Sequence, residues 1–455
     1  MKKFISVNPT TGETMAEFAE LSDTELEKKI AQAQGRFMQW RETTFTERQV
    51  LLHKVAVLLR ERKQQYGEML TKEMGKPVTQ AVAEVEKCAW VCEYYADETA
   101  KIVAPEMVKT DASESYVAFE PLGIVLAVMP WNYAFWQVMR FAAPAVMAGN
   151  VGLLKHASNV PQSAQTLEQV FVDAGFPVGV FQNLLIGSAR VDALISDARV
   201  KAVTLTGSEG AGVQVGATAG REIKPSVLEL GGSDPFIILA DADVAAACEI
   251  GVTARLQNNG QSCIAAKRFI VVSERAEEFV KMFCEKFTAL KIGDPLDTAT
   301  QIGPLATEQG LNDIAALVEK SVAAGAKLVC GGKRVGGKGW FYEPTILTDV
   351  RPGMPAYDKE MFGPVAAVIT VKDANEAVRV ANDTRFGLGA SIWTKSTETA
   401  KKLIPQIEAG AVFVNGLVKS DPRMPFGGIK KSGYGRELAS YGIKAFMNIK
   451  TVWIK

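Results

Sequence analysis

Histidine is almost absent from the sequence, which contains only His53 and His156 among its 455 residues. The six cysteines are scattered, and the one close pair, Cys88 and Cys92, has no second pair with which to complete a metal site. A metal centre is therefore not expected. Two cysteines packed on one helix are the simpler interpretation of this pair.

A net charge is also lacking, because 51 basic residues balance 51 acidic ones. This balance argues against binding to nucleic acid or to an anionic membrane, and it indicates a small-molecule partner. No basic segment followed by an apolar one opens the sequence, and the scattered cysteines are expected to be reduced thiols. We therefore predict a cytoplasmic protein.

An uninterrupted membrane-spanning run is lacking as well. The uncharged stretch 121–139 approaches the length that a bilayer requires, but Pro130, Asn132 and Gln137 interrupt it. A buried strand over 123–129, followed by a turn and a helix, fits this stretch better.

What the sequence does contain is a regular alternation of apolar runs. The chain is too long for one hydrophobic core, and residues 22–104 have the spacing of helices. Apolar and amphipathic runs then alternate over 123–238 and again over 254–416, which is typical of open α/β sheets. The candidate strands are 123–129, 151–154, 180–186, 202–205, 235–239, 269–272, 365–369 and 412–415. Two such series predict two α/β domains with a cleft between them.

The C-terminal segment 430–455 contains glycine-rich turns and the apolar run 448–454, and it is too short to form a domain. We expect this run to add a strand to another subunit. A homodimer is then the minimum assembly, and a tetramer made of two dimers stays open.

One cysteine has unusual neighbours. The sequence Gln-Asn-Asn-Gly-Gln-Ser precedes Cys263, whereas a core cysteine usually has apolar neighbours. A nucleophile needs a tuned thiolate and donors for developing negative charge, and backbone N–H groups at a turn could supply both. On these residues alone, a structural and a catalytic cysteine are both compatible with the motif.

A second motif places a carboxylate at the end of an apolar strand. Glu229 lies in Val-Leu-Glu-Leu-Gly-Gly, where two glycines let the backbone approach another group closely. Burial of this glutamate would raise its pKa, which suits a base that acts near neutral pH.

Together, the two motifs resemble those of the aldehyde dehydrogenase superfamily. Further motifs follow in the family's order and cover nearly the whole chain. They are Pro-Trp-Asn at 130–132, Leu-Lys at 154–155, Thr-Gly-Ser at 206–208, Lys-Glu-Met-Phe-Gly-Pro at 359–364 and Pro-Phe-Gly-Gly-Ile-Lys-Lys-Ser-Gly at 425–433.

The resemblance implies an α/β fold of the aldehyde dehydrogenase type, with two open α/β domains and a small β oligomerisation element. The Rossmann-type nucleotide-binding domain is expected over 1–113 and 131–231, and the catalytic domain over 232–428. The oligomerisation element is expected over 114–130 and 429–455.

The resemblance also makes Cys263 the nucleophile, Glu229 the general base, and Asn132 with the Cys263 backbone N–H the oxyanion donors. Thiolate attack on an aldehyde gives a thiohemiacetal whose oxyanion needs preorganised donors. Hydride then passes to a nicotinamide, and Glu229 activates the water that hydrolyses the thioester on Cys263. A cysteine hydrolase is disfavoured because Cys263 has no histidine near it in the sequence.

No G-x-G-x-x-G fingerprint is present. Instead, a strand that ends at Leu205 is followed by Thr206, Gly207, Ser208 and a helix-like run, which can present N–H groups and a hydroxyl to a pyrophosphate. The resemblance puts the cofactor phosphates there. Its remaining implied cofactor contacts are Trp131, Leu230, Glu360 at the nicotinamide ribose and Phe362 near the nicotinamide ring.

The choice between NAD and NADP depends on Lys155 and Ser158. Many NAD-preferring relatives have a glutamate at the position of Ser158, three residues after the lysine. A carboxylate there would repel a 2′-phosphate, whereas Lys155 attracts one and a serine hydroxyl can donate to it. NADP is favoured, and NAD stays open because a serine does not exclude it.

Arg140 is the only charged residue in a long apolar stretch, where an unpaired guanidinium would be costly. A helix over 132–143 would place Asn132, Trp136 and Arg140 on nearly one face. Arg140 could then hold the carboxylate of an aldehyde bound at Cys263, with Trp136 beside the methylene chain. The alternative is a structural salt bridge between Arg140 and a glutamate elsewhere in the fold.

This region resembles that of bacterial succinate-semialdehyde dehydrogenases, so succinic semialdehyde is the predicted substrate. The loop 418–423 should border the tunnel, with Ser420 as a second carboxylate contact and Lys419 and Arg423 as competitors. Glutarate semialdehyde and uncharged aliphatic aldehydes stay open. Two further alternatives also stay open. One is a CoA-acylating enzyme, although Glu229 argues against it, and the other is a catalytically silent protein with the same fold.

Overall fold

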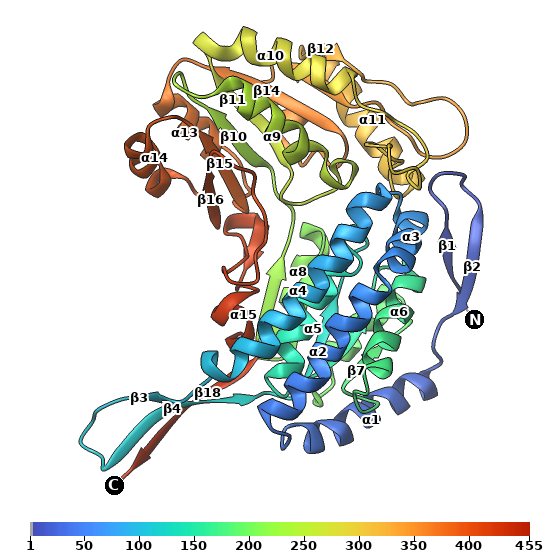
Figure 1. The fold of residues 1–455 in the computed structure, drawn as a ribbon, viewed down its shortest axis with the longest axis vertical. Helices are drawn as coiled ribbons and strands as arrows, with labels where there is room; N and C mark the ends of the chain where they lie inside the picture. The colour runs from blue at the N-terminus through green and yellow to red at the C-terminus, as the bar shows by residue number, and fades with distance from the viewer. Residues whose placement is uncertain (1–2) are drawn as a thin grey trace.

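The chain folds into two α/β lobes and an arm that projects from one of them (Figure 1). The computed structural model describes residues 3–455. A hairpin of β1 (Lys3–Val7) and β2 (Thr14–Ala19) comes first, and the helices predicted over 22–104 follow it. They are α1 (Asp23–Trp40), α2 (Phe45–Glu61), α3 (Lys63–Met74) and α4 (Val78–Ile102). Capping boxes at Ser22 and Thr44 satisfy backbone N–H groups at the starts of α1 and α2.

The first lobe contains a six-stranded sheet in the order β17-β9-β8-β5-β6-β7. Its strands are β5 (Ile124–Val128), β6 (Val151–Lys155), β7 (Phe181–Asn183), β8 (Val200–Thr206), β9 (Ser226–Glu229) and β17 (Gly433–Tyr434). The helices between them are α5 (Trp136–Met147), α6 (Pro161–Asp173), α7 (Val191–Ser196) and α8 (Glu209–Arg221). All neighbouring strands are parallel except β17 and β9. The strand order reverses between β5 and β8, and ligands of such sheets bind beyond the carboxyl ends of the strands at this point.

The second lobe contains a seven-stranded sheet in the order β12-β13-β14-β11-β10-β15-β16. Its strands are β10 (Asp234–Ile238), β11 (Ala266–Val272), β12 (Lys327–Cys330), β13 (Thr345–Thr348), β14 (Val365–Val371), β15 (Gly389–Trp393) and β16 (Ala411–Val414). Its helices are α9 (Val244–Leu256), α10 (Ser273–Thr288), α11 (Glu308–Ala323), α12 (Pro355–Asp358), α13 (Ala374–Asn382) and α14 (Thr397–Leu403). The prediction of two α/β series is confirmed, because each candidate strand overlaps a strand of one of the two sheets. The candidate 235–239 was expected in the first series but is β10 of the second sheet.

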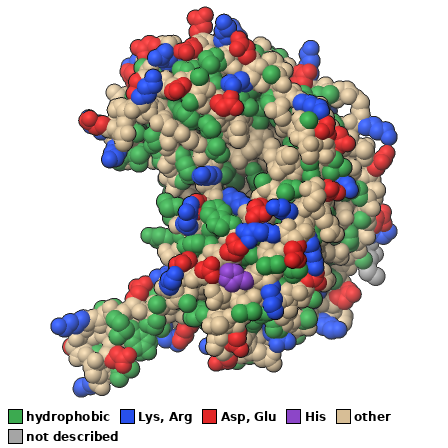
Figure 2. Space-filling model, viewed as in Figure 1, with side chains coloured by type: hydrophobic (Ala, Val, Ile, Leu, Met, Phe, Trp, Pro, Cys, Tyr) green, Lys and Arg blue, Asp and Glu red, His purple; other side chains and the backbone are tan. Residues whose placement is uncertain are grey.

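The arm is a three-stranded antiparallel sheet of β3 (Glu106–Met107), β4 (Glu114–Pro121) and β18 (Met447–Ile454). The short helix α15 (Ala439–Lys444) precedes β18. Large apolar side chains are exposed along the arm, and Figure 2 shows hydrophobic atoms gathered there. They are Met107, Val108, Ile449, Trp453 and Ile454.

Two strands differ from the boundaries expected for the oligomerisation element. β5 lies in the middle of the six-stranded sheet, although the expected element 114–130 includes it. β17 pairs with β9 in the same sheet, although the expected element 429–455 includes it. The reason for β5 is its fully apolar sequence, which needs a neighbouring strand on both edges and helices over the sheet.

Within residues 3–455, no helix is both long and apolar enough to cross a membrane. No three His, Cys, Asp or Glu side chains of this range gather in a group that could hold a metal ion.

Candidate active site

A sharp turn after α9 presents Cys263. Asn258, Asn259 and Gly260 all have positive φ, of 56°, 56° and 75°, which asparagine and glycine tolerate better than other residues. A Cβ at position 260 would lie 2.2 Å from the carbonyl oxygen of Gly363, so only glycine fits there. The polar motif before the cysteine therefore builds the loop that positions it.

Lys267, on β11, holds the backbone of this loop. Its ammonium group donates to the carbonyl oxygens of Ser262, at 2.8 Å, and Cys263, at 2.7 Å. It also lies 3.4 Å from a carboxylate oxygen of Glu360. The lysine is fully buried, and burial lowers its pKa. This side chain places a positive charge beside the nucleophile candidate.

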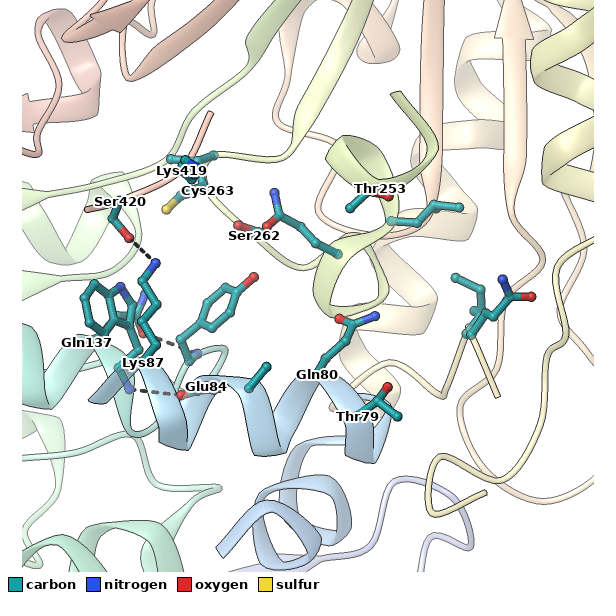
Figure 3. A pocket seen from close by; sticks show the side chains of 18 of the residues that line it. Thr79, Gln80, Glu84, Lys87, Gln137, Thr253, Ser262, Cys263, Lys419 and Ser420 are labelled. Atoms are coloured by element: carbon teal, nitrogen blue, oxygen red, sulfur yellow. Dashed lines mark hydrogen bonds between the residues drawn. The ribbon is translucent and has the colours of Figure 1, made fainter. Parts of the chain in front are cut away.

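Cys263 lines two cavities. The larger cavity, of about 490 Å³, lies among α4, α5 and the loop that follows β16, and Figure 3 shows side chains of its wall. The smaller cavity, of about 250 Å³, lies among the loops that follow β5, β8 and β9. The sulfur atom is therefore accessible to two different ligands, one in each cavity.

Burial raises the pKa of the Cys263 thiol to about 12, and the cations of Lys267 and Arg140 act against this rise. The resting group is then a thiol at neutral pH. Formation of the nucleophilic thiolate requires removal of its proton and stabilisation of the charge that results.

Asn132 faces the same loop from the end of β5. Its side-chain nitrogen donates to the carbonyl oxygen of Gln261 at 3.0 Å. Its backbone carbonyl accepts from the side chain of Asn258 at 2.7 Å. Because an amide nitrogen carries two N–H donors, one is left for an oxyanion next to Cys263, with which Asn132 lines the smaller cavity.

The expected helix over 132–143 is wrong in its first turn, because α5 begins at Trp136 and Asn132 lies in the preceding turn. The carboxylate of Glu84 accepts the backbone N–H groups of Phe135 and Trp136, both at 2.9 Å. A side chain from α4 therefore caps the start of α5. Asn132 and the face of α5 belong to separate elements that the fold brings together.

Glu229 ends β9 and is 2% exposed. Neither carboxylate oxygen has a hydrogen-bond partner among the described residues. Burial raises the pKa of Glu229 well above its usual value, Glu437 raises it further, and the cations of Arg140 and Arg436 act in the opposite direction. The side chain lies against Gly427, where a Cβ would come within 2.6 Å of Oε1. This is an unpartnered carboxylate suited to take up a proton.

Arg140 is buried and forms an ion pair with Glu437. Its guanidinium also donates to Thr206 Oγ1 at 3.3 Å and lies 4.6 Å from the centre of the Phe426 ring. Glu437 therefore matches the alternative prediction, in which Arg140 forms a structural salt bridge with a glutamate from elsewhere in the fold. Arg140 also lines the larger cavity, as does Trp136, and its contact with a substrate carboxylate stays a prediction.

Ser420 lines the larger cavity, where its hydroxyl accepts a hydrogen bond of 2.8 Å from Lys87 (Figure 3). Of its two predicted competitors, Lys419 lines the same cavity but is exposed. Arg423 instead donates to Asp421, at 2.7 and 2.9 Å, and is absent from the cavity wall.

Seven of the nine predicted cofactor residues line the smaller cavity, whose wall does not include Lys155 or Ser158. Five of them follow the carboxyl ends of β5, β8 and β9, or lie at those ends. The other two lie in the loop before β14, on the opposite wall of the cavity. The seven residues are Trp131, Thr206, Gly207, Ser208, Leu230, Glu360 and Phe362. The rings of Trp131 and Phe362 meet edge to face, with centroids 5.8 Å apart. Glu360 accepts the backbone N–H of Gly232 at 3.1 Å, which fixes one carboxylate oxygen.

The loop that follows β8 differs in one detail from the prediction. The N–H of Gly207 donates to the carbonyl oxygen of Glu229 at 2.9 Å and so extends the sheet. Ser208 caps α8 by accepting from the N–H of Ala211. The N–H of Gly207 is therefore engaged in the sheet, and the predicted phosphate contact would need the N–H groups of the first turn of α8.

Lys155 is the last residue of β6 and is buried, and Ser158 lies three residues further on in an exposed turn before α6. Ser158 is thus accessible from the surface beyond the carboxyl end of β6. A carboxylate is absent from this position, which leaves room for a phosphate group.

Four residues of the site were not predicted from the sequence: Lys87, Glu84, Lys267 and Glu437. Gln80, Glu84 and Lys87 have the spacing i, i+4 and i+7, which puts them on one face of α4, and all three line the larger cavity. Polar residues at this spacing, on a helix that is otherwise largely buried, could have indicated that this face of α4 borders a cavity. No such signal exists for Glu437, because its partner lies almost 300 residues earlier in the chain.

The fold and this site define an aldehyde dehydrogenase. The family model of the "Aldehyde dehydrogenase family" matches residues 1–452, and the chain belongs to this family. Its reaction is the oxidation of an aldehyde, and the two cavities that meet at Cys263 suit a substrate and a cofactor.

Among individual proteins, the chain is 55% identical to the probable NADP-dependent succinate-semialdehyde dehydrogenase of Synechocystis sp. over 99% of both chains. It is 52% identical to succinate-semialdehyde dehydrogenase [NADP(+)] 1 of Mycobacterium bovis, again over 99% of both. The solved succinic semialdehyde dehydrogenase of Streptococcus pyogenes in complex with NADP+ superimposes with a TM-score of 0.97, at 38% identity and with 99% of both chains covered.

Proposed function

We propose that this enzyme oxidises succinic semialdehyde to succinate with NADP. The larger cavity is the observation that carries the proposal, because it leads to Cys263 and its wall is cationic. Lys87, Arg140 and Lys419 line it, whereas its one acidic side chain, Glu84, is ion-paired with Lys76. Such a wall attracts an anionic substrate over an uncharged one.

The relatives support the same substrate and cofactor. Two curated proteins that are more than 50% identical to this chain are named as NADP-dependent succinate-semialdehyde dehydrogenases. The similar structure from Streptococcus pyogenes was solved with NADP+.

In the first half of the proposed reaction, the Cys263 thiol loses its proton to solvent, and the thiolate attacks the aldehyde carbon. The carbonyl oxygen becomes an oxyanion, which the free N–H of the Asn132 side chain and the backbone N–H of Cys263 stabilise. The positive charge of Lys267 beside the loop favours the thiolate against the effect of burial. The product of attack is a thiohemiacetal on Cys263.

A bound nicotinamide supplies the acceptor for the hydride that the thiohemiacetal loses. The residues of the smaller cavity fit this group, since Trp131 and Phe362 offer aromatic faces and Glu360 offers a carboxylate for ribose hydroxyls. Lys155 and Ser158 favour a 2′-phosphate, because neither repels it. Loss of hydride leaves a thioester on Cys263.

Hydrolysis of the thioester needs a base, and Glu229 has this role in the proposal. Its raised pKa makes it a stronger base than an exposed glutamate. It takes a proton from water, the hydroxide attacks the thioester carbon, and the Cys263 sulfur leaves as a thiolate. The proton on Glu229 then passes to this thiolate. Release of succinate restores the enzyme.

We also infer a homodimer, formed through the arm. Exposed Ile449, Trp453 and Ile454 on β18 would be covered by another subunit, which removes apolar surface from water. Light scattering on the purified protein tests the assembly, and a monomeric mass would exclude it.

The enzymatic proposal is tested by mixing the purified protein with succinic semialdehyde and either NADP or NAD. Reduced cofactor is followed by absorbance, and the acid is identified by NMR. We expect succinate and reduced cofactor in equal amounts, with a higher kcat/KM for NADP. Failure to form succinate with either cofactor would refute the proposed substrate, and a strong preference for NAD would refute the proposed cofactor.

A further inference from the structure

Lys87 occupies an unusual position on α4. It is half-buried in the wall of the larger cavity, where its ammonium group donates to Ser420 Oγ at 2.8 Å. The same group lies 4.2 Å from the centre of the Trp136 ring, a cation–π contact. Figure 3 shows Lys87 and Ser420 pointing toward each other, close to the labelled Cys263. An aromatic wall, a hydroxyl and a cation thus meet in one place.

Lys87 has no carboxylate partner among residues 3–455. The acids nearest to it on α4 and on the Ser420 loop are already engaged, Glu84 with Lys76 and Asp421 with Arg423. A cation removed from water without a counter-charge is costly, so its retention in a cavity requires an explanation.

Arg140 offers the opposite case in the same cavity. Its guanidinium is ion-paired with Glu437, whose carboxylate compensates its charge. A substrate carboxylate at Arg140 would therefore compete with an existing partner. At Lys87 it would complete an ion pair that the protein leaves open.

We propose that Lys87 is the specificity-determining residue that receives the carboxylate of the aldehyde substrate, and that Ser420 shares this carboxylate. The inference deepens the proposed oxidation of succinic semialdehyde and rests on it. An ammonium group has three N–H donors, and Ser420 uses its oxygen to accept one of them. Two donors of Lys87 and the hydroxyl proton of Ser420 remain for the two carboxylate oxygens.

Trp136 completes the arrangement because its ring borders both the ammonium group and the cavity. An aliphatic chain between the carboxylate and the aldehyde can pack on this ring while the aldehyde reaches Cys263. The cavity therefore selects for a charge at one end of the substrate and reactivity at the other.

A pH dependence follows. Burial and the neighbouring Arg140 cation lower the pKa of Lys87 to about 8. The groups that act in the opposite direction are Cys88, Glu84 and Asp421. Only protonated Lys87 attracts a carboxylate, so the KM for succinic semialdehyde should increase as the pH rises through this pKa. The KM for butanal, which has four carbons and no carboxylate, should not follow this change.

The test compares steady-state kinetics of K87M, K87R, K419M and the control K101M on succinic semialdehyde and on butanal. Lys101 lies on the same helix, is 72% exposed and pairs with Glu98, so its loss leaves the cavity unchanged. We expect K87M to lower kcat/KM for succinic semialdehyde roughly 10- to 100-fold, mainly through KM, as for a lost charge-assisted hydrogen bond. Butanal turnover should stay within about threefold of wild type, which also shows that the variant is folded.

The arginine of K87R keeps its charge at all accessible pH values. This variant should recover part of the affinity for succinic semialdehyde and should lose the rise in KM above pH 8 that wild type shows. Equal losses on both aldehydes in K87M, or a selective loss in K419M with none in K87M, would overturn the inference.

Wild-type kinetics separate this inference from the function on which it rests. If wild type prefers succinic semialdehyde but K87M keeps that preference, Lys87 is excluded and the function stands. If wild type shows no preference over butanal, the proposed function itself fails.

Discussion

The two cavities that meet at Cys263 differ in charge and in origin. The larger one is lined by the cations Lys87, Arg140 and Lys419, which come from α4, α5 and the loop that follows β16. The smaller one contains the carboxylate of Glu360 and two aromatic rings, Trp131 and Phe362, that meet edge to face. The larger cavity suits a short anionic substrate. The smaller cavity suits the nicotinamide ring and the ribose hydroxyls of the cofactor. Cys263, the proposed nucleophile, lies where the two environments meet, so a change in one cavity should affect one ligand.

Loss of the residue that both cavities share should have the largest effect. Cys263→Ala removes the nucleophile and should lower kcat by roughly 10⁴-fold or more. Because the smaller cavity stays intact, NADP binding measured by calorimetry should stay close to that of wild type. Substantial aldehyde oxidation by this variant would contradict a thioester on Cys263.

Glu229→Gln should separate the two halves of the reaction. The amide cannot accept a proton from water, so hydrolysis should slow by roughly 10²- to 10⁴-fold. Stopped-flow absorbance should then show a burst of reduced NADP close to the enzyme concentration, followed by slow turnover. A wild-type steady-state rate would exclude Glu229 as the base.

Arg140→Met tests the difference between Arg140, whose charge is compensated by Glu437, and Lys87, which has no carboxylate partner among the described residues. If Arg140 also contacts the substrate, kcat/KM for succinic semialdehyde should fall roughly tenfold while butanal is spared. Loss of the ion pair leaves Glu437 buried alone and should lower stability by about 3 kcal/mol, which thermal unfolding can measure. An equal decrease in kcat/KM for both aldehydes would show that Arg140 has only a structural role, as the partner of Glu437.

The smallest predicted effect lies at the outer edge of the cofactor site. Ser158→Glu adds a carboxylate that repels a 2′-phosphate and should lower kcat/KM for NADP about tenfold. The KM for the aldehyde should not change, and Ser158→Ala is the matched control without charge. Unchanged NADP kinetics would show that Ser158 does not face the 2′-phosphate.

The fold was predictable because its signals are local. Strands such as β5 and β14 are apolar runs of a few residues, and the motifs at Glu229 and Cys263 are continuous in sequence. Strands that were not predicted, such as β13 (Thr345–Thr348) and β15 (Gly389–Trp393), lack such a run. The turn before Cys263 follows from two asparagines and a glycine that accept positive φ. These features need no knowledge of distant residues.

The parts that could not be predicted depend on long-range contacts. α5 begins at Trp136 because Glu84, about 50 residues earlier, caps it. The partner of Arg140 is Glu437, from the segment after the seven-stranded sheet. Lys87 enters the larger cavity only because α4 packs beside α5, as Figure 1 shows. Sequence patterns describe single elements, whereas these pairings come from the way in which elements pack.

The most direct measurement of the central claim is the ratio of kcat/KM for succinic semialdehyde to that for butanal, with NADP at saturation. Both aldehydes have four carbons and differ at the end far from Cys263. A cationic cavity predicts a ratio of roughly 10 to 100 or more in favour of succinic semialdehyde, which decreases at high salt. A ratio near one at low salt would contradict carboxylate recognition in this cavity.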